Sequence, residues 1–146
     1  MRKLSVSSGF SLVEVTLALG IAAFCLLAVF ALIPVAALTN RNATSQTAAT
    51  NIMAAVVADL RATPKTNTTS TQFGIRFGTN TTLYFDGTGQ FTTSLSTNSR
   101  YRLDVTWSGS GWNGLRYADV KVTWPAAGAP ANASGSTEMF AAFDRN

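Results

Sequence analysis

The chain begins with a long apolar segment, and polar residues dominate after it. No residue from Val15 to Leu38 is charged, and most are Ala, Leu, Val, Ile or Phe. At about 1.5 Å of rise per residue, this run forms a helix of roughly 36 Å, whereas the apolar core of a bilayer is about 30 Å thick. We therefore expect a transmembrane helix over residues 10–38, in which Pro34 and Gly20 can introduce a kink.

A second apolar pattern follows and has the period of an amphipathic helix. Its apolar residues recur at steps of three and four: Ala49, Ile52, Met53, Val56, Val57 and Leu60. Asp59 lies off this stripe, and Arg61 followed by Thr63-Pro64 marks the predicted end. The sequence thus predicts an amphipathic continuation of the helix over residues 39–62, with a weak stretch over 39–47 that is open to melting or hinging.

The remaining residues, 63–146, alternate apolar and polar positions as β strands do. The predicted strands lie around Phe73 to Phe77, Leu83 to Phe85, Phe91, Tyr101 to Trp107, Val120 to Trp124 and Thr137 to Phe143. Asp86-Gly87-Thr88-Gly89 predicts a hairpin turn. The pattern indicates an exported β-rich globular domain and an α+β fold, in which the long N-terminal helix packs on a small antiparallel sheet.

Composition and charge set the topology and remove several kinds of chemistry. The 146 residues include 11 Lys and Arg, 7 Asp and Glu, no His, and one Cys, Cys25, inside the apolar run. Without His, neither a Ser-His-Asp triad nor an imidazole metal site can form. Arg2 and Lys3 precede the apolar run, so the positive-inside tendency holds that end in the cytoplasm. We expect a single-pass protein of the inner membrane whose C-terminal domain is periplasmic or extracellular.

Three kinds of N-terminal segment compete for this pattern: a cleaved secretory signal, a simple membrane anchor and a specialised filament leader. A secretory signal has an apolar core of about 7 to 15 residues, which is shorter than this one. The filament leader is favoured by Gly9-Phe10-Ser11-Leu12-Val13-Glu14-Val15-Thr16-Leu17, which puts a Gly before the apolar run and a lone acid five residues after that Gly.

This segment closely resembles the prepilin-type cleavage and methylation signal of type IV pilins and type II secretion pseudopilins. In that family a membrane aspartyl peptidase cuts after the Gly and N-methylates the new first residue. The resemblance implies that residues 1–9 are a basic leader removed on processing, with the cut between Gly9 and Phe10. Phe10 then becomes the methylated N-terminus. The implied partners are a prepilin peptidase and other pilins or pseudopilins, which are contacted through the N-terminal helix in an assembled filament.

Glu14 is the unusual residue of the apolar segment. A charged side chain in a membrane helix costs on the order of 2 to 3 kcal/mol toward the centre and less near the interface, so we expect it to have a role or a partner. The resemblance implies that Glu14 pairs with the N-terminal amine of a neighbouring subunit and so sets the register of assembly. The alternative is a Glu that is merely tolerated at the level of the lipid headgroups.

The second half carries a narrower resemblance on softer motifs. Leu83-Tyr84-Phe85-Asp86, Tyr101-Arg102-Leu103, Val122-Thr123-Trp124-Pro125 and the terminal Asp144-Arg145-Asn146, together with the N-terminus, look like the Verru_Chthon cassette protein B family. Its members resemble minor pilins of the modification-protein class and minor pseudopilins. The resemblance implies a low-abundance structural component, not the bulk subunit, and no enzyme activity.

Other chemistry is weaker in this sequence. The carboxylates are scattered, with no nucleophile beside a recognisable base, so we expect no catalytic residues, metal or cofactor. Arg100, Arg102, Arg116 and Lys121 alternate with aromatic residues and suggest a nucleic-acid surface, but strand alternation gives the same pattern from a core and a solvated face. Nucleic acid is therefore an unlikely partner. The runner-up function is a bitopic membrane protein whose β domain binds a surface ligand or envelope partner, with a DNA-binding filament tip as a third possibility.

Overall fold

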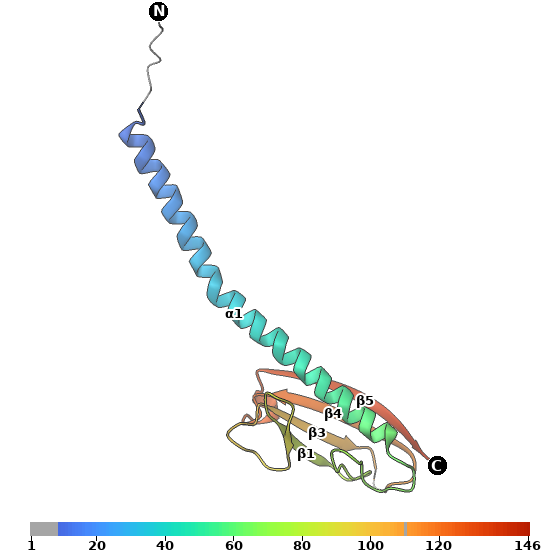
Figure 1. The fold of residues 1–146 in the computed structure, drawn as a ribbon. Coiled ribbons are helices and arrows are strands. Elements are labelled where there is room, and N and C mark those ends of the chain that lie inside the picture. The colour runs from blue at the N-terminus through green and yellow to red at the C-terminus, as the bar shows by residue number, and fades with distance from the viewer. Residues whose placement is uncertain (1–8, 110) are drawn as a thin grey trace, which may run out of the picture. The chain divides into compact units, whose positions relative to one another are not determined.

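The computed structural model describes residues 9–109 and 111–146. Within these residues the chain forms one long α-helix followed by five β strands (Figure 1). The elements are α1 (Leu12–Ala62), β1 (Thr81–Phe85), β2 (Phe91–Thr92), β3 (Tyr101–Trp107), β4 (Gly114–Trp124), a 3-10 turn (Pro130–Asn132) and β5 (Gly135–Arg145). This combination of a long apolar helix and an antiparallel sheet confirms the predicted α+β class.

The chain divides into two compact units, Met1–Arg41 and Asn42–Asn146. In the described part of the first unit, α1 runs from Leu12 onward and every side chain is exposed. This part of α1 is long and apolar enough to cross a membrane. Apolar side chains on all sides of a helix need lipid or other apolar helices around them, because water solvates them poorly. A membrane-capable helix near the N-terminus is therefore confirmed.

Helix α1 continues through the two places where the sequence predicted weakness. Pro34 lies inside the helix, which extends on both sides of it, so the predicted kink remains a prediction. Residues 39–47 are helical as well. The hydroxyl of Thr39 donates to the carbonyl of Val35 (2.9 Å), and that of Thr47 donates to the carbonyl of Ala43 (3.0 Å). These hydroxyls bond one turn back along the helix, which lets a Thr-rich stretch stay helical.

The second unit is built on an antiparallel sheet with the strand order β2-β1-β3-β4-β5. β3 and β4 form its centre, whereas β5 is an edge strand that pairs along its whole length with β4, from Gly114↔Arg145 to Trp124↔Gly135. β4 and β5 are longer than the sequence predicted. Their outer ends were missed because the apolar residues there, such as Leu115 and Tyr117, lie on the solvent side of the sheet.

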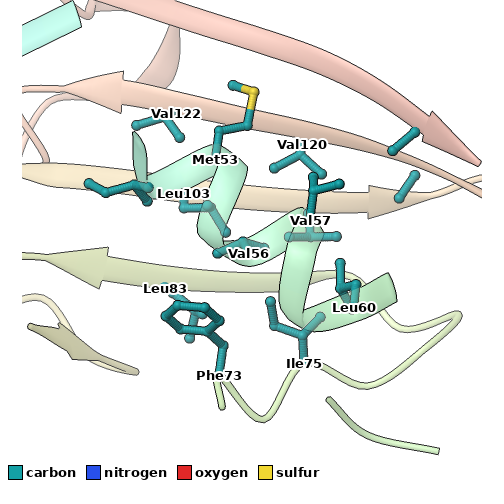
Figure 2. Close-up of a cluster of buried hydrophobic side chains, with 14 of the residues drawn as sticks. Met53, Val56, Val57, Leu60, Phe73, Ile75, Leu83, Leu103, Val120 and Val122 are labelled. Carbon is teal, nitrogen blue, oxygen red and sulfur yellow. The ribbon is translucent and has the colours of Figure 1, made fainter. Parts of the chain in front are cut away.

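The core of this unit lies between the last turns of α1 and one face of the sheet (Figure 2). All six residues of the predicted helical stripe are buried, which confirms that prediction. From the sheet, β3 contributes alternate residues, and β1 and β4 contribute Leu83, Val120 and Val122. Burying a full Leu, Ile, Val or Phe side chain contributes about 1.5–3 kcal/mol, so this stripe holds residues 49–60 of α1 against the sheet.

The segment around Phe73, Ile75 and Phe77 is not a strand of the sheet, contrary to the prediction. Its side chains alternate in burial as expected, but its backbone forms a loop held by an isolated bridge between Thr69 and Arg76. The loop lies against the end of α1, where its three apolar side chains complete the core. Alternation of apolar and polar residues shows only that one side of a segment is buried. An irregular segment that covers a core can have the same pattern as a strand.

Asp59 fixes this loop to the helix, although its place off the apolar stripe had suggested a solvent-facing residue. Its carboxylate accepts hydrogen bonds from the backbone N–H of Gln72 and of Phe73, both at 3.0 Å. The side chain is buried at this point. A buried carboxylate held by two backbone donors is satisfied as an acceptor, and the two bonds order the start of the loop.

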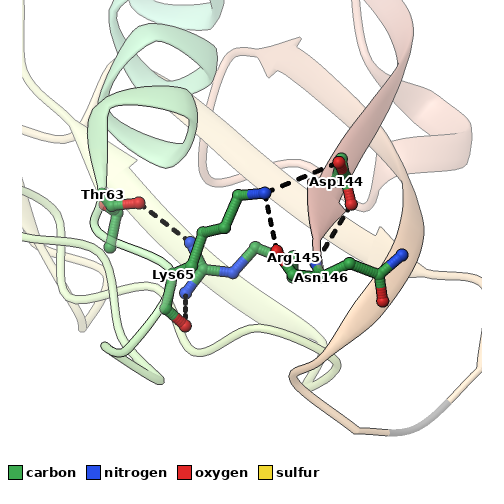
Figure 3. A network of polar contacts seen from close by, with 5 residues as sticks. All are labelled: Thr63, Lys65, Asp144, Arg145 and Asn146. Carbon is green, nitrogen blue, oxygen red and sulfur yellow. Dashed lines mark hydrogen bonds and ion pairs between the residues drawn. The ribbon is translucent and has the colours of Figure 1, made fainter.

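The C-terminus is anchored beside the end of α1 by Arg145 (Figure 3). This side chain is 5% exposed, and its Nη1 donates to the carbonyl of Thr63 (2.9 Å). Its Nη2 donates to the carbonyls of Pro64 (3.0 Å), Lys65 (3.2 Å) and Asn67. The guanidinium also stacks 4.0 Å from the ring centre of Phe77. A single side chain from the last strand thus donates hydrogen bonds to four carbonyls of the segment that follows α1.

Arg145→Ala is expected to lower the free energy of unfolding by about 2–4 kcal/mol, because it leaves several carbonyls without their donor and opens space beside Phe77. The measurement is denaturant unfolding of the full chain in mild detergent, followed by tryptophan fluorescence. Lys65→Ala is the matched control. Its amine makes an exposed ion pair with Asp144 (3.6 Å), and such pairs contribute about 0–1 kcal/mol. Equal losses from the two variants would contradict the assigned role of Arg145.

Candidate functional site

The start of α1 carries a capping box formed by Ser11 and Glu14. The backbone N–H of Val13 donates to the hydroxyl of Ser11 (3.3 Å), and the backbone N–H of Ser11 donates to Oε2 of Glu14 (3.1 Å). Each side chain thus satisfies a backbone donor at the helix end. The signal for it, Ser followed by Glu three residues later, is present in the sequence. There, however, Glu14 was interpreted as an assembly residue or as an acid tolerated at the lipid headgroups, and not as a cap.

The same turn places the predicted N-terminal residue and the predicted register residue on one face of the helix. Phe10, Glu14, Val15, Ala18, Leu19 and Ala22 line an open groove along the start of α1. Glu14 is the charged residue of this groove, and the others are apolar. The small residues Ala18 and Ala22 lie one turn apart, and a neighbouring helix can approach closely at such positions.

The predicted cleavage position is accessible in the structure. Gly9 and Phe10 precede α1, and both are exposed. A Cβ added at Gly9 would meet no atom within 4 Å, so the fold itself does not require glycine here. Arg2 and Lys3 belong to the basic leader and lie outside the described residues. Pro34 lies in α1, roughly 30 Å beyond Glu14 at about 1.5 Å per residue, and is not part of this site.

Residues 9–109 and 111–146 hold no group of three or more Cys, Asp or Glu side chains that could bind a metal ion. Cys25 is exposed on the apolar helix. The Asp86 loop is a hairpin turn between β1 and β2, as predicted. Its carboxylate accepts hydrogen bonds from the backbone and hydroxyl of Thr88 (2.8 and 2.7 Å), and these bonds lower the pKa of Asp86.

The basic residues of the sheet do not form one surface. Arg102 is paired with Asp104 at 2.9 Å, and Lys121 with Glu138 at 3.2 Å. On β4, Lys121 and Arg116 are an odd number of residues apart, so their side chains lie on opposite faces of the sheet. Nucleic-acid binding by this sheet therefore gains no support from the arrangement, since its charges are divided between faces and partly neutralised.

The outer face of the sheet, opposite α1, carries apolar and acidic residues that the sequence reasoning did not single out. Tyr117 and Phe140 stack with ring centres 5.7 Å apart and an angle of 12° between planes. Beside them, Oδ1 of Asp119 is buried without a hydrogen-bond partner among the described residues. Burial raises the pKa of Asp119, and the nearby charge of Glu138 raises it further, against the smaller opposite effect of Lys121.

Comparisons with protein-family models, with curated proteins and with solved structures find no match for this chain. The family resemblance therefore stands on the motif residues alone. The function is therefore inferred from the chemistry of the residues in the two units.

Asp119→Asn is expected to stabilise the chain at neutral pH. Because the folded-state pKa of Asp119 is raised, its contribution is most favourable at low pH and is lost as pH rises through that pKa. The amide escapes this loss, so the stability gain over wild type should shrink as the pH falls. Unfolding midpoints measured in detergent from acid to neutral pH test this.

Asp86→Asn is the control of opposite sign. The hydrogen bonds of the turn lower the pKa of Asp86, so its ionised form stabilises the fold at neutral pH and loses that effect in acid. The amide should therefore be less stable than wild type at neutral pH. A lower neutral midpoint for Asp119→Asn than for wild type would contradict the assignment of Asp119.

Proposed function

We propose that this chain is a minor pilin or pseudopilin, a structural subunit that is cut between Gly9 and Phe10 by a prepilin peptidase. It then assembles into a type IV pilus-like or type II secretion-like filament. The observation that supports this most is the arrangement at the start of α1. The motif lies on exposed chain directly before the part of α1 that is exposed on all sides and is long and apolar enough to cross a membrane, and Phe10 and Glu14 line one groove.

Cleavage at this position would turn the groove into a charged pairing site. The new amine of Phe10 would lie one turn before the carboxylate of Glu14, at the helix end whose dipole favours negative charge. Among the described residues, Glu14 accepts a hydrogen bond from the backbone N–H of Ser11 through Oε2, and its Oε1 accepts none. This second oxygen is the one that an amine from a neighbouring subunit would reach.

Assembly then follows from the two properties of this helix. Its apolar surface lets it move from lipid into a bundle of like helices at little cost, because both surroundings are apolar. An unpaired charge in such a bundle is costly, and breaking a buried pair costs about 3–5 kcal/mol. A subunit is therefore held most stably where its Glu14 meets an amine, and this selects one axial register.

The proposal predicts that Phe10 is the first residue of the mature protein. On coexpression with a prepilin peptidase, mass spectrometry should find a chain that lacks residues 1–9 and carries one N-terminal methyl group. Gly9→Leu should block this processing without unfolding the chain, since a side chain at Gly9 meets nothing in the fold. A wild-type chain that keeps Met1 would favour the bitopic membrane protein instead.

Glu14→Gln is expected to enter the membrane, to be processed normally and to be lost from sheared filament fractions. Gln can still cap Ser11, since the capping box accepts Glu or Gln, but it offers no charge to a neighbouring amine. The loss should be tenfold or more, because about 1.4 kcal/mol already gives a factor of ten. Immunoblots of sheared and membrane fractions provide the measurement.

Ser11→Ala is the matched control for this experiment. It removes the hydroxyl that caps Val13 and keeps the charge of Glu14, at a cost of about 1 kcal/mol to the helix end. It should still reach the filament fraction. If Glu14→Gln assembles like wild type, the register mechanism is wrong. If Ser11→Ala fails as severely as Glu14→Gln, the capping box explains the defect and the charge does not.

A further inference from the structure

The outer face of the sheet presents an exposed patch on strands β4 and β5. We call Tyr117, Asp119, Glu138 and Phe140 the acid-aromatic patch. Phe140 is 67% exposed, and Tyr117, which stacks on it, is 37% exposed. Large aromatic side chains on a solvent-facing sheet are unusual for a surface that stays in water, and they commonly mark a contact site.

The acids of this patch are only partly neutralised by the described residues. Glu138 pairs with Lys121 at 3.2 Å, so this one cation faces two carboxylates. Asp119 has a buried oxygen without a hydrogen-bond partner among the described residues, and the pKa of its carboxyl is raised by burial. The patch therefore combines apolar surface with an excess of one negative charge, which a cation from another molecule would complement.

A surface of the opposite character lies on the helix side of the same edge strand. Ala54, Val57, Ala58, Arg61 and Met139 line an open groove between α1 and β5, which we call the Arg61 groove. Arg61 is exposed and makes no ion pair with the described residues. Met139 is 39% exposed and flexible enough to adapt to a partner. The groove thus offers one unpaired cation on an apolar floor.

The two surfaces cannot meet within one chain. Met139 and Phe140 are consecutive residues of β5, so their side chains lie on opposite faces of the sheet. A contact between the patch and the groove therefore requires two copies. Such a contact joins two different surfaces, one on each copy.

We propose that the acid-aromatic patch of one copy docks in the Arg61 groove of a second copy of this chain. Phe140 packs against Met139 and the alanines of the groove, and Arg61 pairs with Asp119 and Glu138. This inference rests on the proposed assembly into a filament, and it adds that two copies lie side by side there.

Disulfide crosslinking between two differently tagged copies tests this contact. Both copies carry Cys25→Ser, because Cys25 is exposed on the apolar helix. One copy carries Ala58→Cys in the groove, and the other carries Ala142→Cys beside Tyr117 on the outer face. A disulfide dimer should form in the coexpressed pair. Thr92→Cys on β2, at the opposite edge of the sheet, replaces Ala142→Cys as the matched control and should give none.

Charge reversal tests the ion pairs of the same interface. Arg61→Glu in one copy should lower the crosslink yield by about three- to fivefold, the size of one exposed ion pair. Glu138→Lys in the other copy should do the same, and combining the two should restore most of the yield. Unfolding midpoints of each variant exclude loss of the fold as the cause.

The outcomes separate this interface from the proposed function. If the chain is processed at Phe10 and enters filaments, but the Ala142→Cys yield does not exceed the Thr92→Cys yield, the interface is wrong and the function stands. Crosslinking of Ala142→Cys to a different protein also overturns the second copy as the occupant. A chain that is neither processed nor found in filaments, and that gives no crosslink, overturns both.

Discussion

The proposed assembly of this protein depends on the ion pair that the carboxylate of Glu14, at the start of an apolar helix, can make with an amine of a neighbouring subunit. Glu14 is tolerated because Ser11 gives it a backbone donor and the helix dipole favours its charge. Neither effect explains why an acid follows an exposed glycine and lines an otherwise apolar groove with Phe10. A cap needs only a side-chain oxygen, which Gln would supply. In the proposed assembly the charge of Glu14 has a further role, because it pairs with an amine of a neighbouring subunit.

The helix that carries this acid presents apolar side chains in two different ways. Over the first unit its large apolar side chains are exposed on all sides, which suits lipid or a bundle of like helices. From Ala49 onward only one stripe is apolar, and that stripe is covered by the sheet. One continuous helix therefore serves a membrane-like environment at its start and a folded domain at its end. Arg145 and Asp59 stabilise the C-terminal part of the helix by forming hydrogen bonds with the backbone of the segment that follows it.

The spacing of apolar residues predicted most of this fold, because a helix or strand that is buried on one side has apolar residues at regular intervals. The stripe from Ala49 to Leu60 and the alternation from Tyr101 to Trp107 both correspond to buried faces. Periodicity gave wrong predictions where the burial pattern of a segment does not correspond to its secondary structure. Phe73 to Phe77 alternate in burial without joining the sheet, and Leu115 and Phe140 are apolar on the outside. Asp59 and Arg145 could not be assigned, since their partners are backbone groups of segments distant in the chain. The site at Glu14 was predicted from its motif and stays a prediction, whereas the capping role of Glu14 was overlooked.

Four residues that the fold does not explain share one property. This property bears on the choice between a filament subunit and a simple membrane anchor. Among the described residues, Glu14 and Arg61 have no charged partner, one carboxylate oxygen of Asp119 has no hydrogen-bond partner, and Phe140 is largely uncovered. Natural sequences break local rules mainly at functional sites. An anchor needs an apolar helix, but it needs neither an acid at the start of that helix nor an acidic aromatic patch and a cationic groove on its β domain. The proposed contacts between subunits would use all four groups, and for this reason we favour the filament.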